Sequence, residues 1–308
     1  MKKLKKPTTA ILMATLIFSN IQICPIYGDK VENTSKQMIE KKYRNEKYQN
    51  NYFEKNYKNK KESTYIKNYV SQSKDANTII NIPDANFKKE IYKTLNKQDN
   101  ETITKGELES IRDLYILNSE ITNLEGIQYC INLENLTLCN NQINDISALS
   151  ELTNLRDLEL RDNQISDIRA LTNLTNLRNL YLSDNQISDI SPLTNLTNLE
   201  RLYLYNNEIS DISTLTNLNN LIILNLDNNQ IDDISVLTNL NNLGDLTLCN
   251  NQISDISALT NLDNLTTLNL DSNQISDISA LKNSNDLIYL NLSYNEISDI
   301  SALKNLNN

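Results

Sequence analysis

Residues 179–190 read NLYLSDNQISDI, and 22 residues later residues 201–212 read RLYLYNNEISDI. The same motif recurs along the chain, and its leucines keep the same spacing. The aligned leucines are Leu133, Leu155, Leu177, Leu199, Leu221, Leu243, Leu265 and Leu287. A self-similar period of this length indicates stacked coils, because one coil alone cannot bury its leucines. The chain is therefore predicted to form a solenoid of leucine-rich repeats.

Each repeat divides into a short strand and a returning arm. Leu180 and Leu182 flank Tyr181, an alternation that predicts two inward leucines and an outward tyrosine. The apolar residues that follow are three apart: Ile187, Ile190, Leu193, Leu196 and Leu199. Three residues per turn is the geometry of a 3-10 helix. The fold class predicted is an α/β solenoid of 22-residue repeats, with a concave parallel β-sheet and a 3-10-like convex side.

Two polar positions are constant within this frame. An asparagine follows the strand of every unit, and a stacked amide column can pair backbone groups that an interior turn leaves unpaired. The column is Asn141, Asn163, Asn185, Asn207, Asn229, Asn251, Asn273 and Asn295. Asp189 and its counterparts precede the second isoleucine and are predicted to cap the returning arm. The glycine-rich loops of calcium-binding solenoids are missing, so no metal or other cofactor is expected.

The region before the repeats is predicted to close the first coil. In residues 77–132, Asp84 can cap one helix, and Thr104 with Glu107 forms the capping box of a second. The end of this region, 111–132, reads as a degenerate first repeat. Eight full repeats then fill residues 133–308, and no C-terminal cap follows them.

The first 76 residues differ in composition from the repeats. Residues 1–28 begin with lysines and continue into a short apolar run, which is typical of a secretory signal peptide; an uncleaved membrane anchor is the alternative. Residues 29–76 are basic and rich in Lys, Asn and Tyr, which predicts a mostly disordered linker. A contact of this linker with anionic cell-wall polymer is the alternative reading. Export predicts a secreted or cell-surface location.

Composition excludes several classes of function. The chain has no histidine, so Ser-His and Cys-His nucleophile pairs and His-ligated metals are excluded, and no enzyme is expected. From Ala76 onward there are 13 basic residues and 32 acidic residues, an excess of about 19 negative charges. Such a charge argues against nucleic acid as a partner.

The cap and the repeats together match a known family. The cap ends in LEGIQYCINLENL at residues 124–136, and the repeats follow the line LxxLxLxxNQISDISxLxxL. Over residues 79–308 the chain resembles the internalin family of bacterial surface proteins. The resemblance implies an exported protein whose concave face binds another protein, often on a host cell. Family members commonly continue into an immunoglobulin-like cap and a wall-anchoring segment, neither of which is present here, so the mode of attachment stays open.

The outward strand positions vary while the frame stays constant, and they are where a binding specificity can be encoded. Large amphipathic and charged residues gather on three adjacent strands. The candidate partner-binding residues are Tyr181, Tyr203, Tyr205, Arg161, Arg201, Arg178, Glu159 and Asp157. Tyr and Arg are the residue types that often dominate binding energy at protein interfaces, which favours a binding site here. The alternative is that tyrosines are present only because they are favoured on strand surfaces. The partner expected is a protein ligand, for example a host cell-surface receptor.

Three functions follow as hypotheses. The first is an exported, adhesin-like protein that binds a protein partner on its concave face. The second is an envelope-associated scaffold held to wall polymer by residues 29–76. The third is a cytoplasmic regulatory leucine-rich-repeat protein, against which the signal peptide argues.

Overall fold

The computed structural model describes residues 75–306. These residues lie within one compact unit, Asn68–Asn308. The predicted signal peptide and nearly all of the predicted linker lie outside the described residues.

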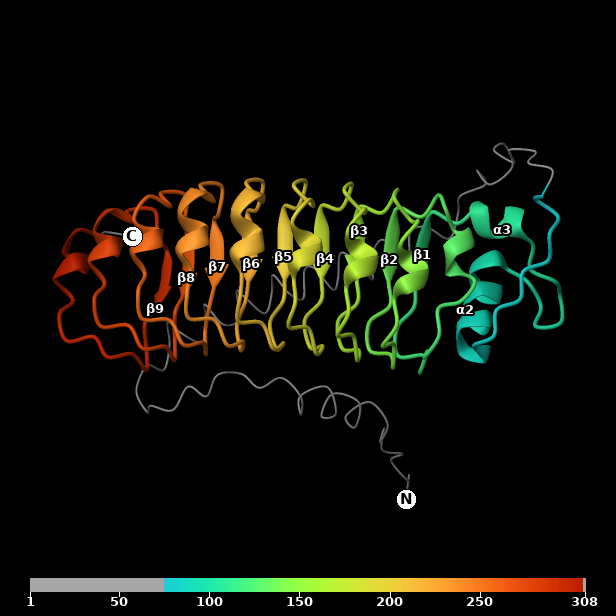
Figure 1. Cartoon of the computed structure of the whole chain (residues 1–308), viewed down its shortest axis with the longest axis horizontal. Helices are drawn as coiled ribbons and strands as arrows, with labels where there is room; N and C mark the ends of the chain where they lie inside the picture. The colour runs from blue at the N-terminus through green and yellow to red at the C-terminus, as the bar shows by residue number, and fades with distance from the viewer. Residues whose placement is uncertain (1–74, 307–308) are drawn as a thin grey trace, which may run out of the picture. The chain divides into compact units, whose positions relative to one another are not determined.

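The strands form one parallel sheet whose order follows the chain (Figure 1). Each strand has three residues, and each pairs with the next at a register of one repeat, as in Leu180 with Leu202. The strands are β1 Asp113–Tyr115, β2 Asn135–Thr137, β3 Asp157–Glu159, β4 Asn179–Tyr181, β5 Arg201–Tyr203, β6 Ile223–Asn225, β7 Asp245–Thr247, β8 Thr267–Asn269 and β9 Tyr289–Asn291. The parallel sheet expected from the repeat period is confirmed.

The returning arms are 3-10 helices on the opposite side of the array from the strands (Figure 1). They are η1 Ile127–Tyr129, η2 Ser147–Leu149, η3 Arg169–Leu171, η4 Ser191–Leu193, η5 Ser213–Asn217, η6 Ser235–Asn239, η7 Ser257–Leu259, η8 Ser279–Asn283 and η9 Ser301–Asn305. None exceeds five residues, which suits a spacing of three because longer 3-10 helices are uncommon. The prediction of a 3-10 convex side is confirmed.

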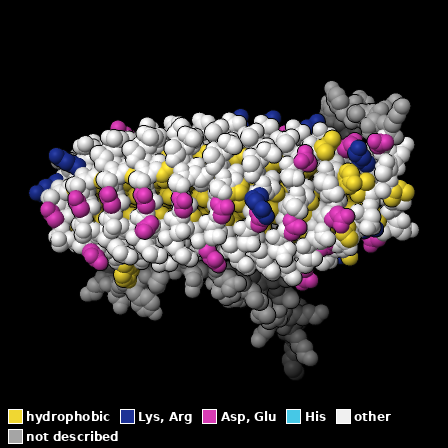
Figure 2. Space-filling view, viewed as in Figure 1, with side chains coloured by type: hydrophobic (Ala, Val, Ile, Leu, Met, Phe, Trp, Pro, Cys, Tyr) yellow, Lys and Arg dark blue, Asp and Glu magenta, His cyan; other side chains and the backbone are white. Residues whose placement is uncertain are grey.

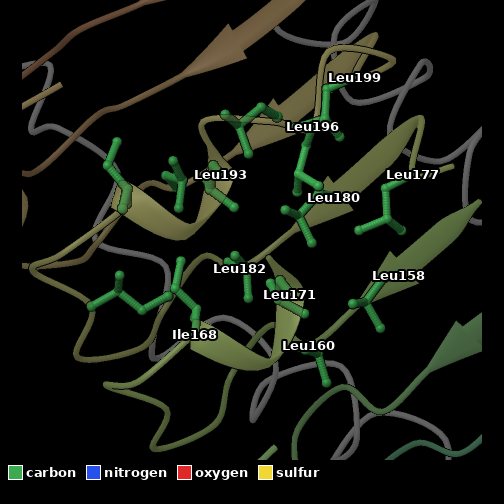
Figure 3. Packing of buried hydrophobic residues seen from close by; sticks show 14 of the residues in the cluster. Leu158, Leu160, Ile168, Leu171, Leu177, Leu180, Leu182, Leu193, Leu196 and Leu199 are labelled. Carbon is green, nitrogen blue, oxygen red and sulfur yellow. The ribbon is translucent and has the colours of Figure 1, made fainter. Parts of the chain in front are cut away.

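The core runs along the array between these two sides. Leu180 and Leu182 of the strand layer and Leu193 of the arm layer are fully buried, and Figure 3 shows them packing in successive tiers. Burial of one such side chain stabilises the fold by about 1.5–3 kcal/mol. Each tier is closed by the next coil, and in the ninth coil Leu290 and Leu292 are only partly buried.

The asparagine that follows each strand is tied to backbone groups of two coils. The Nδ2 of Asn185 donates to the carbonyls of Leu160 and Leu182 at 3.0 Å and of Ser183 at 3.1 Å. Its Oδ1 accepts the N–H of Ile165 at 3.0 Å. One side chain thus satisfies buried groups on its own turn and on the preceding turn, which holds neighbouring coils in register.

A second amide ladder, not anticipated from the sequence, runs along the loops that lead into the strands. Asn198 donates through Nδ2 to the carbonyl of Thr175 at 2.8 Å, and Asn220 donates to Thr197 in the same way. The other members are Asn132, Asn154, Asn176, Asn242 and Asn264. The sequence signal is an asparagine just before the aligned leucine.

The aspartates before the second isoleucine cap the 3-10 arms. Asp189 Oδ1 accepts the N–H of Ser191 at 2.8 Å, and the same bond recurs from Asp145 to Asp299. Acidic side chains accordingly appear at regular intervals along the arm side of the array (Figure 2). Their regular spacing is explained by capping alone.

Two helices cover the first coil, α2 Ala85–Leu95 and α3 Lys105–Glu109. Asp84 caps α2 by accepting the N–H of Phe87, and its other oxygen accepts the N–H groups of Thr122 and Asn123. Burial alone would raise the pKa of Asp84, but these hydrogen bonds hold it below its usual value. The capping box of α3 is formed as predicted. Among residues 75–306, no helix is long and apolar enough to span a bilayer.

Candidate functional site

The outward side of the sheet is called the strand face here. In β4 and the residue pair after it, the outward positions are Asn179, Tyr181 and Ser183, and equivalent positions recur with every repeat. Most of them carry short side chains. Large side chains gather most densely on β3–β5, in a group called the tyrosine cluster: Glu159, Arg161, Tyr181, Tyr203 and Tyr205.

Two rings of the tyrosine cluster are stacked. Tyr181 and Tyr203 are register partners on β4 and β5, and their ring centres are 4.9 Å apart with planes 14° from parallel. Neighbouring strands of a sheet lie about 4.8 Å apart, so in-register tyrosines meet at stacking distance. The sheet itself therefore positions the rings.

Arg161 joins the members of the cluster. Its guanidinium carbon lies over the ring of Tyr181, 5.8 Å from the ring centre, and its Nε donates to Glu159 Oε1 at 2.7 Å. Its positive charge also acts on Tyr205, where it opposes the rise in pKa that burial of the phenol causes. Burial alone would lower the pKa of Arg161, but the carboxylate of Glu159 raises it, so the guanidinium stays charged.

The three tyrosines are half-buried phenols. Burial raises the pKa of each of them, and for Tyr203 burial, with the electrostatic effects of Tyr181 and Asp245, raises the pKa to about 12. At neutral pH the hydroxyls are protonated, so they can both donate and accept hydrogen bonds. Large rings with polar ends on a supported surface suit recognition of another surface.

A polar line runs beside the cluster. The Asn179 amide donates to Asp157, and Arg201 Nη1 donates to Asn179 Oδ1 at 3.0 Å. Within the described part of the chain, Arg201 forms no ion pair. Asn179 was not among the predicted site residues. The sequence contains the signal for it, because Asn179 lies 22 residues after Asp157 and 22 residues before Arg201.

Arg178 lies apart from the other predicted residues. It precedes β4, and its Nη1 is 2.9 Å from Glu200 Oε1. Together with Ile222 and the second asparagine ladder, this pair lines a shallow groove beside the sheet. The structure brings together seven of the predicted site residues on the strand face and places Arg178 on its flank.

The cysteines of the described residues are buried and unpaired with one another. Burial raises the pKa of Cys130 to about 12, and burial followed by the nearby Glu159 raises the pKa of Cys139. The thiol of Cys249 donates to Asp271 at 3.5 Å. Protonated, buried thiols are poor nucleophiles, which agrees with a packing role.

Comparisons with known proteins agree with the leucine-rich-repeat fold. A family model described as "Leucine Rich repeats (2 copies)" matches residues 153–195, 197–239 and 241–283. The fold is similar to that of an internalin (inlF) of Listeria monocytogenes, with 38% identity, 73% of this chain and 80% of that chain covered, and a TM-score of 0.56.

Two further solved structures are similar. Internalin C2 of the same organism is 38% identical, with 73% of this chain and 90% of that chain covered and a TM-score of 0.56. A leucine-rich-repeat protein of Leptospira interrogans is 27% identical over 64% of this chain and 53% of its own, with a TM-score of 0.60. No curated protein sequence matches the chain.

Proposed function

The chain belongs to the internalin family of leucine-rich-repeat proteins, and on that premise we propose that it is an exported protein that binds a protein partner through its strand face. The tyrosine cluster on β3–β5 is the centre of the contact. The partner is a receptor on the surface of a host cell, which makes the protein an adhesin.

The observation that carries this proposal is the supported ring stack. The ring centres of Tyr181 and Tyr203 are 4.9 Å apart, and Arg161 is hydrogen-bonded to Glu159 and lies over the Tyr181 ring. Side chains that are already ordered lose little conformational entropy on binding, so more of the contact energy appears as affinity. Tyr and Arg are also the residue types in which binding energy concentrates.

The shape of the site favours a macromolecular surface as its partner. The cluster stands on an open sheet, whereas small-molecule sites are typically concave pockets that enclose most of the ligand. The repeats and cap carry an excess of negative charge, which disfavours nucleic acid. A protein surface with complementary polar groups fits both properties.

The basic segment 29–76 supports a second candidate function. Its charge suits anionic wall polymer, so that the repeats would act as a scaffold or spacer at the envelope. This candidate predicts that cell-wall retention depends on the segment and is indifferent to the strand face.

The experiment compares binding of the full exported chain to cultured host cells and to bacterial wall preparations. The test variant is Tyr181→Ser/Tyr203→Ser/Tyr205→Ser, with circular dichroism to verify its fold. The matched control is Tyr289→Ser, which removes an exposed tyrosine from β9 of the same face.

The proposal expects host-cell binding that falls at least tenfold in the triple variant and is unchanged in the control. Equal binding by the folded triple variant would refute the site. If the protein binds wall preparations but no host cells, the adhesin function is refuted and the scaffold function is supported.

A further inference from the structure

The ring stack ends at Tyr203. The next position in the column is Asn225, its register partner on β6. The Asn225 side chain folds back, and its Oδ1 accepts the N–H of Asp227 at 3.0 Å. Because this amide is bound to its own strand, it does not continue the stack. We call the space over Asn225, beside the second ring face of Tyr203, the open end of the stack.

The two ends of the stack differ. At the first end, the guanidinium of Arg161 lies over Tyr181 and is paired with Glu159. At the open end, no residue between 75 and 306 places a cation or another ring on Tyr203. The strand face thus has a cation over the ring of Tyr181, whereas no residue among 75–306 places a cation over the ring of Tyr203.

Acidic residues lie beyond the open end. Asp245 on β7 acts electrostatically on the Tyr203 hydroxyl, as Arg201 and Arg161 also do, and Asp227 stands in the outer column just after β6. The outward positions of β6–β9 contain no Lys or Arg. The surface beyond Tyr203 is therefore anionic, and it attracts a positively charged group from a partner.

We propose that the open end of the stack binds an arginine side chain of the protein partner, with its guanidinium stacked on Tyr203 and paired with Asp245. The planar guanidinium can stack on a ring while its N–H groups bond a carboxylate, which a lysine ammonium cannot do equally well. A carboxylate accepts hydrogen bonds at about four positions, so Asp245 can bind an incoming group beside its existing contact.

This assignment rests on the proposed function, since it names the chemistry that the strand face recognises in its partner. The protein itself contains the same combination of groups, since Arg161 lies over the ring of Tyr181 and is paired with Glu159.

The test uses three small probes that differ only at the side-chain head: the N-acetyl amides of arginine, lysine and citrulline. Each is titrated into the full exported chain, and the ring signals of labelled tyrosines are followed by NMR. We expect saturable shifts of Tyr203 with arginine, binding weaker on the order of fivefold with lysine, and none with uncharged citrulline.

Two variants and a control locate the site. Asn225→Tyr places a further ring at the open end and is expected to abolish the arginine-specific shift; its fold is preserved because β4 and β5 already carry tyrosine at this position. Asp245→Asn is expected to weaken binding at least threefold. Asp263→Asn makes the same charge change at an exposed residue outside the outward strand positions and is expected to leave binding unchanged.

Equal binding of all three probes, or an arginine shift that persists in Asn225→Tyr, would overturn the assignment. The two proposals fail separately. If host cells are bound but the arginine probe produces no shift, the arginine site is wrong and the adhesin stands. If the probe binds with the expected selectivity and no host cell is bound, the adhesin is wrong and the arginine site stands.

Discussion

Two stretches of the strand face, β3–β5 and β6–β8, share one frame and differ in their outward residues. Inside, Leu202 and Leu246 are equivalent and equally buried. Outside, β3–β5 carries stacked rings and a paired arginine, whereas β6–β8 carries no aromatic ring and no cation, and its outward residues are mostly asparagines, threonines and aspartates. The comparison separates two tasks: the inward residues stabilise the array, and the outward residues decide what it binds.

The largest expected effect tests the shared interior. Leu202→Ala and Leu246→Ala should each lower the free energy of unfolding by about 3 kcal/mol, because each leaves a cavity in a fully buried tier. Urea denaturation followed by circular dichroism measures both. The two values should agree within about 1 kcal/mol, and a larger gap would show that the outward residues also determine local stability.

The next effect tests the asparagine ladder in the two stretches. Asn207→Ala and Asn251→Ala each remove three Nδ2 bonds and the acceptor for an isoleucine N–H, and should each lower the free energy of unfolding by about 2 kcal/mol. The same denaturation experiment applies. Retention of stability in either variant would mean that water replaces the amide there.

A smaller effect should appear only in β3–β5. Arg161→Met leaves the buried carboxylate of Glu159 without its cation and is expected to destabilise the fold by about 1–2 kcal/mol. Arg201→Met, which removes a bond to a neutral amide, should cost less than about 1 kcal/mol. In a double variant, Glu159→Gln should recover part of the loss from Arg161→Met. Similar costs for both arginines would contradict the pairing described for Arg161.

The smallest effect concerns alkaline pH. Burial raises the pKa of Tyr203 to about 12, whereas a tyrosine in the unfolded chain titrates near 10. A group with a raised folded pKa stabilises the protein fully below the unfolded pKa and loses this contribution as pH rises through the folded pKa. Stability should therefore fall between about pH 10 and 12, and less steeply in Tyr203→Phe, with thermal melting as the measurement. Identical dependence of the melting temperature on pH in the original protein and in Tyr203→Phe would contradict the raised pKa of Tyr203.

Much of the candidate site was predictable because the repeat converts sequence distance into spatial distance. Residues 22 apart are neighbours on adjacent strands, so Tyr181 and Tyr203 could be placed side by side from the sequence alone. Arg178 was misplaced with the cluster because it stands next to the strand in sequence, yet its position precedes the first outward residue. Arg178 is one residue before the first outward position of β4, and this difference places it on the flank and not on the strand face.

The bonds within the cluster were not predictable. A column of letters does not show that Asn225 bonds its own strand or that Arg161 is shared among Glu159, Tyr181 and Tyr205. Those choices depend on which rotamer leaves fewest polar atoms unpaired, and that is decided by all neighbours at once.

The sequence by itself determined the solenoid, its parallel sheet, its 3-10 arms and its capped first coil, because a leucine period of 22 residues allows the core to be buried in only one way. The tertiary structure decided the character of the strand face. Outward side chains are not required to be apolar by the leucine period, so their partners are selected by contacts between coils. In this protein those contacts leave one end of the ring stack occupied by Arg161 and the other open beside Asp245.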